Sequence, residues 1–119
     1  MLHSLLRSLK CRQVGQTQMN ISVDGTAGTP SASGPDAAFI ESITDNGVGS
    51  WTINFKEAAK IAPFVTGIVS LTADTTFIVA AVTVSSITVT ARSVVAAPAA
   101  IDADFNIQWQ YSDQLSYYF

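Results

Sequence analysis

The sequence predicts an all-β protein, an antiparallel β-sandwich or jelly-roll-like barrel of about seven strands that follows a short N-terminal amphipathic arm. Two observations predict this class. From about Ile21 onward, short runs alternate apolar and polar residues with a period of two, and turn-forming Gly, Asp, Asn and Pro residues separate the runs. No repeat of fixed period runs along the chain, which disfavours a solenoid. We therefore expect two parts, an arm over residues 1–12 and a β-sandwich domain over residues 13–119.

The alternating runs give the expected strands in order: residues 18–24, 37–44, 50–55, 64–71, 75–82, 86–91 and 104–111. Residues 25–35 contain three Gly and two Pro and are expected to form a loop. The second and third strands should form a hairpin, in which Asn46-Gly47 supplies the positive φ angles of the turn. Residues 56–60 are expected to form a helical turn that ends before Pro63, and residues 93–100 a loop or a short crossover.

The composition indicates a protein that has neighbours. Hydrophobic residues make up 48% of the chain and charged residues only 13%, whereas about 25% charge is typical of soluble domains. Ser, Thr, Asn, Gln and small apolar residues must therefore cover the surface, and such a surface is typical of interaction sites. All nine acidic residues lie in residues 13–119, which argues against broad contact with nucleic acid. The sequence contains no stretch of about 18 apolar residues, so no membrane span is predicted.

The sequence offers little catalytic chemistry, and we expect no catalytic, cofactor-binding or metal site. His3 is the single histidine and Cys11 the single cysteine, so neither a zinc site nor an intrachain disulfide is expected. Cys11 is expected to be a buried free thiol. Asp102, Asp104 and Asp113 could bind calcium, but solvated strand ends are the favoured interpretation. Trp51 and Trp109 could form a sugar platform, but they occupy the apolar faces of alternating runs, which favours core packing.

The two ends of the chain are the predicted partner contacts. Leu2, Leu5, Leu6 and Leu9 fall at helical spacing, and an isolated helix of about 10 residues is marginal in water, so this arm requires a groove to hold it. That groove could belong to another chain, which is favoured, or to the protein's own domain. The aromatic C-terminus has no strand pattern, which suits an interface or packing back onto the domain. The predicted partner-contact residues are Leu2, Leu5, Leu6, Arg7, Leu9, Lys10, Arg12, Tyr117, Tyr118 and Phe119.

Two short motifs stand out in the chain. The first is Asn46-Gly-Val-Gly-Ser-Trp-Thr-Ile-Asn-Phe55, followed by Ala58, Ala59 and Ala62-Pro-Phe-Val65. It resembles a β-hairpin pattern of head-decoration and tail-fibre modules, which are small structural proteins of tailed-bacteriophage virions. The second, Asp102-Ala-Asp-Phe-Asn-Ile-Gln-Trp109 with Tyr111 and Asp113, looks like the last strand of small phage head proteins. The resemblance covers residues 37–113. It implies an all-β structural protein without enzyme activity or cofactor, added in many copies to a capsid or tail.

These observations favour a non-enzymatic capsid decoration or cement protein that docks on the major capsid protein or another virion protein. As a decoration protein it would form a symmetric homo-oligomer and lie at the capsid surface of the virion after synthesis in the host cytoplasm. Nucleic acid, membrane and small-molecule partners are not expected. The alternative is a tail-fibre or tail-spike component, an adhesin module that binds a host glycan. A small hydrolase is the least favoured class, because it would depend on His3 and no nucleophile motif is present.

Overall fold

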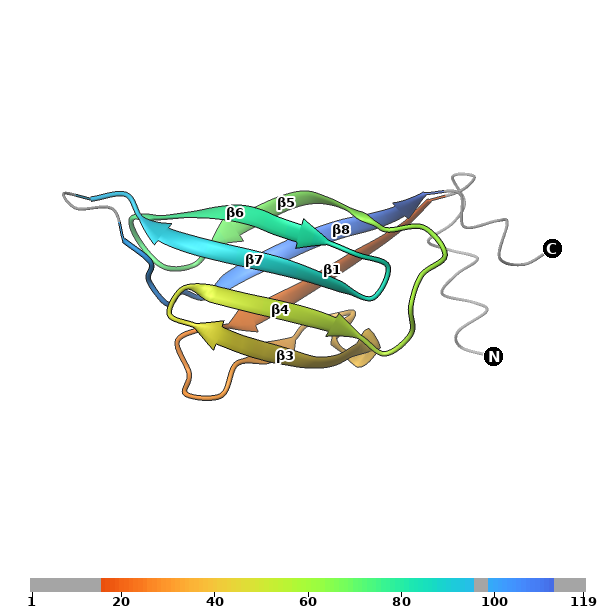
Figure 1. The fold of residues 1–119 in the computed structure, drawn as a ribbon, viewed down its shortest axis with the longest axis horizontal. Coiled ribbons are helices and arrows are strands. Elements are labelled where there is room, and N and C mark those ends of the chain that lie inside the picture. The colour runs from red at the N-terminus through yellow and green to blue at the C-terminus, as the bar shows by residue number, and fades with distance from the viewer. Residues whose placement is uncertain (1–15, 96–98, 113–119) are drawn as a thin grey trace.

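The computed structural model describes residues 16–95 and 99–112, which form a sandwich of two four-stranded antiparallel sheets (Figure 1). The first sheet has the order β2-β1-β8-β5 and the second the order β3-β4-β7-β6. The strands are β1 (Gln16–Asp24), β2 (Ser31–Ser33), β3 (Ile40–Gly47), β4 (Ser50–Phe55), β5 (Phe64–Ser70), β6 (Thr75–Val82), β7 (Ser86–Ser93) and β8 (Phe105–Ser112). The predicted all-β sandwich is confirmed, with eight strands within the described residues.

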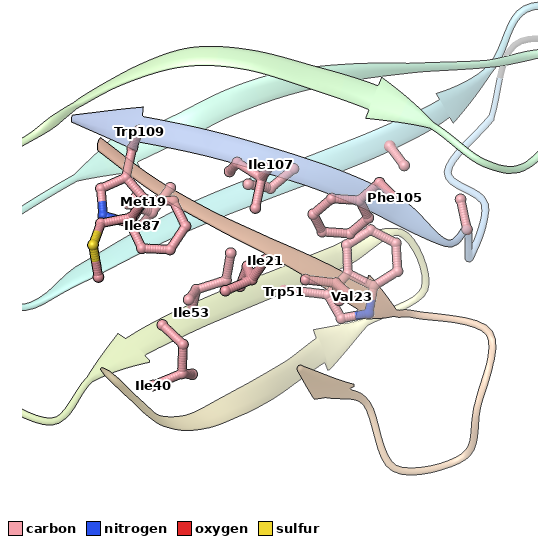
Figure 2. Packing of buried hydrophobic residues seen from close by; sticks show 13 residues of the cluster. Met19, Ile21, Val23, Ile40, Trp51, Ile53, Ile87, Phe105, Ile107 and Trp109 are labelled. Carbon is pink, nitrogen blue, oxygen red and sulfur yellow. The ribbon is translucent and has the colours of Figure 1, made fainter. Parts of the chain in front are cut away.

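The core lies between the sheets and is built from the inward positions of the alternating runs. Across β1 and β8, Met19 lies opposite Trp109, and Ile21 opposite Ile107. Figure 2 shows these side chains meeting those of the second sheet, such as Ile53 and Ile87. The core residues are Met19, Ile21, Val23, Ile40, Trp51, Ile53, Ile87, Val89, Ala91, Ala103, Phe105, Ile107 and Trp109. The period-two patterns therefore place one face of each central strand out of water, as expected for a sandwich.

Aromatic rings fill the two ends of this core. At one end the Trp51 and Phe105 rings are tilted with centroids 5.4 Å apart, and Phe77 approaches Phe105 at 4.8 Å. At the other end Phe55 stacks on Trp109 at 5.7 Å. Both tryptophans are fully buried, so the interpretation of Trp51 and Trp109 as core residues is confirmed, and neither presents a platform to a sugar.

Four local predictions are wrong. Residues 31–33 form the short strand β2 inside the expected loop, and residues 37–39 form a 3₁₀ turn, η1 (Ala37–Phe39), where a strand was expected to begin. Residues 56–60 form bends and no helical turn. The β3–β4 turn is centred on Val48-Gly49, because Gly47 lies opposite Ser50, and the positive φ angles belong to Gly47 (122°) and Gly49 (71°), while Asn46 has none.

Asp36 joins the segment between β2 and β3 to strand β1. Its side chain is 3% exposed, and its carboxylate accepts a hydrogen bond of 2.7 Å from the backbone N–H of Asn20. The backbone N–H of Asp36 also donates to the carbonyl of Asn20 at 3.3 Å. Asp36 thus continues the pairing along β1 beyond Ser22, where the ladder with β2 stops.

Candidate interaction surfaces

The ten predicted partner-contact residues all lie outside the described residues, and the same holds for His3, Cys11 and Asp113. The structure does establish where their segments join the domain. Gln16 at the start of β1 lies opposite Ser112 at the end of β8. Residues 1–15 and 113–119 are therefore attached to the same end of the sandwich, which we call the terminal end (Figure 1).

The opposite end of the sandwich, which we call the loop end, is formed by residues 25–30, 48–49, 71–74, 94–95 and 99–104. Several aliphatic side chains are exposed there: Val48, Leu71, Val94 and Val95. Hydrogen bonds tie the loops to one another, since the Val94 N–H donates to the Asp74 carbonyl at 2.9 Å and the Gly49 N–H to the Asp102 carboxylate at 2.9 Å. The loop end is thus a hydrogen-bonded surface with aliphatic residues at its turns.

Asp104 is the most organised carboxylate of the loop end. It accepts hydrogen bonds from the Thr26 backbone N–H at 3.1 Å and the Thr26 hydroxyl at 3.0 Å, and that hydroxyl also lies 3.2 Å from Asp24. Burial raises the pKa of Asp104, but hydrogen bonds from the Thr26 N–H and hydroxyl, an interaction with the Asp24 carboxyl group and a hydrogen bond from the Gly25 N–H lower it more, so the net pKa lies below the ordinary 3.8. The carboxylate therefore stabilises the folded loop as an anion.

The two aspartates that could have been calcium ligands within the described residues hold loops together instead. Asp102 accepts the hydrogen bond of Gly49, and Asp104 those of Thr26. Residues 16–95 and 99–112 contain no group of three or more His, Cys, Asp or Glu side chains placed to hold a metal ion. The interpretation as solvated strand ends thus understates their role, because both carboxylates connect segments that are distant in sequence.

The lowered pKa of Asp104 predicts that the protein loses part of its stability in acid. Because the folded pKa of Asp104 lies below the ordinary value of 3.8, its carboxylate contributes its full stabilisation above that value, and this contribution is lost as pH falls through the folded pKa. We expect Asp104→Asn to lower the melting temperature less at about pH 3 than at about pH 6. Thermal melts at both pH values check this, with Glu57→Gln, an exposed carboxylate of the β4–β5 connection, as the matched control. An equal loss at both pH values would contradict it.

The outer faces of both sheets carry uncharged polar side chains that bond across strands. On the second sheet the Asn54 amide donates to Ser42 at 3.1 Å and to Thr44 at 2.9 Å, and Thr52 lies 3.1 Å from Thr88. On the first sheet the Gln18 amide donates to Gln108 at 3.0 Å. Most of the outer faces is thus covered by uncharged side chains that bond to one another, as the low charge of the composition predicted, with Asp24 and Arg92 near the ends of β1 and β7 as charged residues.

The four edge strands of the sandwich differ in how they are protected. Exposed edges pair readily with other chains, and proteins usually block them with charge, proline or short length. β2 has three residues, and β3 carries Glu41 and Asp45. β5 and β6 contain no charged residue and no proline. They lie at one side of the sandwich, where Val69 (62%) and Ile78 (57%) are exposed and a shallow groove runs between the two strands.

The β5–β6 edge was not predicted from the sequence, although a signal was present. Residues 64–82 contain Asp74 as their single charge, and this position falls in the turn between the two strands.

The only helical turn in the described part of the chain, η1, has three residues, far fewer than a bilayer requires. Comparison with known proteins adds no relative, since no family model, no curated protein and no solved structure matches the chain.

Proposed function

We propose that this protein is a non-enzymatic structural component of a bacteriophage virion, a capsid decoration protein that attaches in many copies to the major capsid protein. The observation that carries the proposal is the pairing of Gln16 with Ser112. It joins residues 1–15 and 113–119 to the terminal end, so both predicted groups of contact residues are tethered to one end of a rigid sandwich. Two tethered segments that act together raise the effective concentration of each at a common partner.

The leucine stripe of the arm supplies the energy of attachment in this proposal. Burying Leu2, Leu5, Leu6 and Leu9 contributes about 1.5–3 kcal/mol each, and ordering the arm offsets part of that gain. Repetition of a modest contact over a closed shell then produces stable attachment through avidity. The outer faces, which carry mostly uncharged polar side chains, and the protein's four-stranded layers suit a passive structural role, in which satisfied polar side chains face solvent.

The test is co-sedimentation of the purified protein with particles of its phage that lack it. We expect the double substitution Leu5→Asp and Leu6→Asp to weaken attachment at least about tenfold, because two buried leucines are replaced by charges. The matched control is Val48→Asp, which places the same charge on an aliphatic residue that is 65% exposed at the opposite, loop end. Circular dichroism checks that both variants keep the β-domain.

The outcomes separate the alternatives. Loss of attachment in the arm variant alone supports docking through the terminal end. Equal attachment of the arm variant and the unmodified protein contradicts the role of the arm. Immunogold label spread over the head supports decoration, label confined to the tail favours the glycan-binding adhesin, and absence of label from every particle overturns the virion role.

A further inference from the structure

The β5–β6 edge exposes backbone hydrogen-bonding groups in a regular pattern on β6. In the ladder with β7, Phe77 lies opposite Ala91 and Thr75 opposite Ser93. The N–H of Ala91 donates to Gly49 and that of Ser93 to Ala99, so both residues point their backbone away from β6. In an antiparallel ladder, two directly opposed residues either bond to each other through their N–H and C=O groups or both point these groups away from each other. The N–H and C=O groups of Thr75, Phe77 and, two residues on, Val79 therefore face the open edge.

The same reasoning shows that β5 offers less. The Leu71 N–H donates to Asp104, so Leu71 and Val69 turn their backbone toward β8 and only Ile68 and Ser70 of the regular stretch face outward. A register shift between Val65 and Gly67 interrupts β5 before that stretch. On β6 the register shift comes after Val79, which leaves Thr75–Val79 as the longest regular open edge at this side.

We propose that β6 is a self-association surface, and that the strand Thr75–Val79 pairs antiparallel with the same strand of a second copy around a twofold axis at Phe77. This inference deepens the proposed function, since it rests on the association of many copies and names the surface that joins two of them. In this register Phe77 lies opposite Phe77 of the second copy, and Thr75 lies opposite Val79. Each of these residues then meets donors and acceptors that match its own.

The absence of charge from β6 favours a second copy as the occupant. Pairing a strand with its own copy brings like charges together if the strand is charged, and like charges directly opposite are destabilising. An equivalent twofold pairing of β3 about Ile43 would put Glu41 opposite Asp45 of the other copy. The sequence Thr-Thr-Phe-Ile-Val has no charge to repel its copy. The exposed Ile78 would lie opposite Thr76 of the second copy, and the groove beside β5 would be covered.

The first test is the mass of the full-length protein by analytical ultracentrifugation over a range of concentrations. We expect a concentration-dependent dimer that Ile78→Lys converts to monomer, because a lysine on an edge strand opposes pairing and the two copies would bring their lysines to neighbouring positions on one face. The matched control is Val48→Lys, a similarly exposed aliphatic position outside the β5–β6 edge, which should still dimerise. A monomer at every concentration, or a dimer that Ile78→Lys leaves intact, overturns the proposal.

The second test fixes the register by disulfide cross-linking. In a Cys11→Ser background, Thr76→Cys and Ile78→Cys are made as separate proteins and then mixed and oxidised. Directly opposed non-hydrogen-bonded residues are close enough for a disulfide, so the mixture should cross-link while each protein alone should not. Cross-linking of Thr76→Cys or Ile78→Cys alone, or none in the mixture, contradicts this register.

A third comparison distinguishes the second copy from the protein's own arm as the cover of β6. If residues 1–12 cover the edge, the full chain is monomeric and a chain that begins at residue 13 dimerises, which overturns the proposal for the intact protein. Failure of the proposed function has a different signature. If the protein dimerises through β6 but never sediments with particles, this inference stands and the virion role is contradicted.

Discussion

Replacing Gly25 with alanine is expected to destabilise the protein by about 3 kcal/mol, the upper part of the usual range for an overpacked core. A Cβ atom at this position would lie 2.7 Å from Cζ2 of Trp51 and closer still to the carbonyl oxygen of Ala103. The carbonyl belongs to the backbone and the Trp51 ring is fully buried, so neither can move away cheaply. The glycine is therefore required by close approach of the chain to the core.

Chemical denaturation followed by tryptophan fluorescence measures this effect. The matched control is Gly28→Ala in the same connection, because a Cβ there meets nothing within 4 Å. The control should change the free energy of unfolding by less than about 0.5 kcal/mol. Similar unfolding curves for the two variants would show that Gly25 is not packed against Trp51.

Truncation of Trp109 is the second large effect. Trp109→Ala should cost about 3–5 kcal/mol, because a fully buried indole is removed and a cavity is left. The ring stacks on Phe55, and its Nε1–H donates to the Tyr111 hydroxyl at 3.2 Å. A loss of this size is a large share of the about 5–15 kcal/mol that stabilises a typical domain.

The conservative variant Trp109→Phe tests how much of this effect comes from the six-membered ring. It keeps an aromatic ring against Phe55 and removes the five-membered ring of the indole together with its N–H, so we expect a clearly smaller loss than for alanine. Both are measured by urea unfolding with circular dichroism as the signal. Equal losses in the two variants would mean that the packing of the six-membered ring against Phe55 contributes little.

The strands that the sequence predicted are those whose two faces differ. Trp51 and Ile53 on β4, and Ile107 and Trp109 on β8, alternate with polar residues because one face is buried and the other meets water. β2 escaped prediction because Ser31–Ser33 contains no large apolar residue and pairs with β1 through its backbone. Period-two reasoning detects side-chain burial and is blind to a strand without it.

The turn between β3 and β4 was misplaced for a different reason. Asn46-Gly47 is a strong local turn signal, yet the turn lies at Val48-Gly49. The Gly49 N–H donates to Asp102, its carbonyl accepts from Ala91, and a Cβ on Gly49 would approach the Ile101 N–H to 2.8 Å. These partners are distant in sequence, so the choice between two adjacent glycine turns is made by tertiary contacts that a local motif does not contain.

The interaction surfaces were predictable only in part. The amphipathic arm and the aromatic C-terminus are visible as patterns, but their attachment to one end depends on the pairing of β1 with β8. The β5–β6 edge depends on which strands lack a neighbour, and strand order is set by pairings between distant segments. The absence of charge from these two strands was readable in the sequence, but its meaning required the order of the sheets.

The position of β8 has a consequence for synthesis of the protein. β8 is the last strand of the described residues, yet it lies between β1 and β5 in the first sheet. Until residues 105–112 have left the ribosome, β1 and β5 have no strand to join them, and the inner face of the second sheet, which includes Trp51, lacks half its cover. Non-local pairing of this kind is slow. We therefore expect the domain to acquire its native core only after residues 105–112 have left the ribosome, with the nascent chain dependent on chaperones until then.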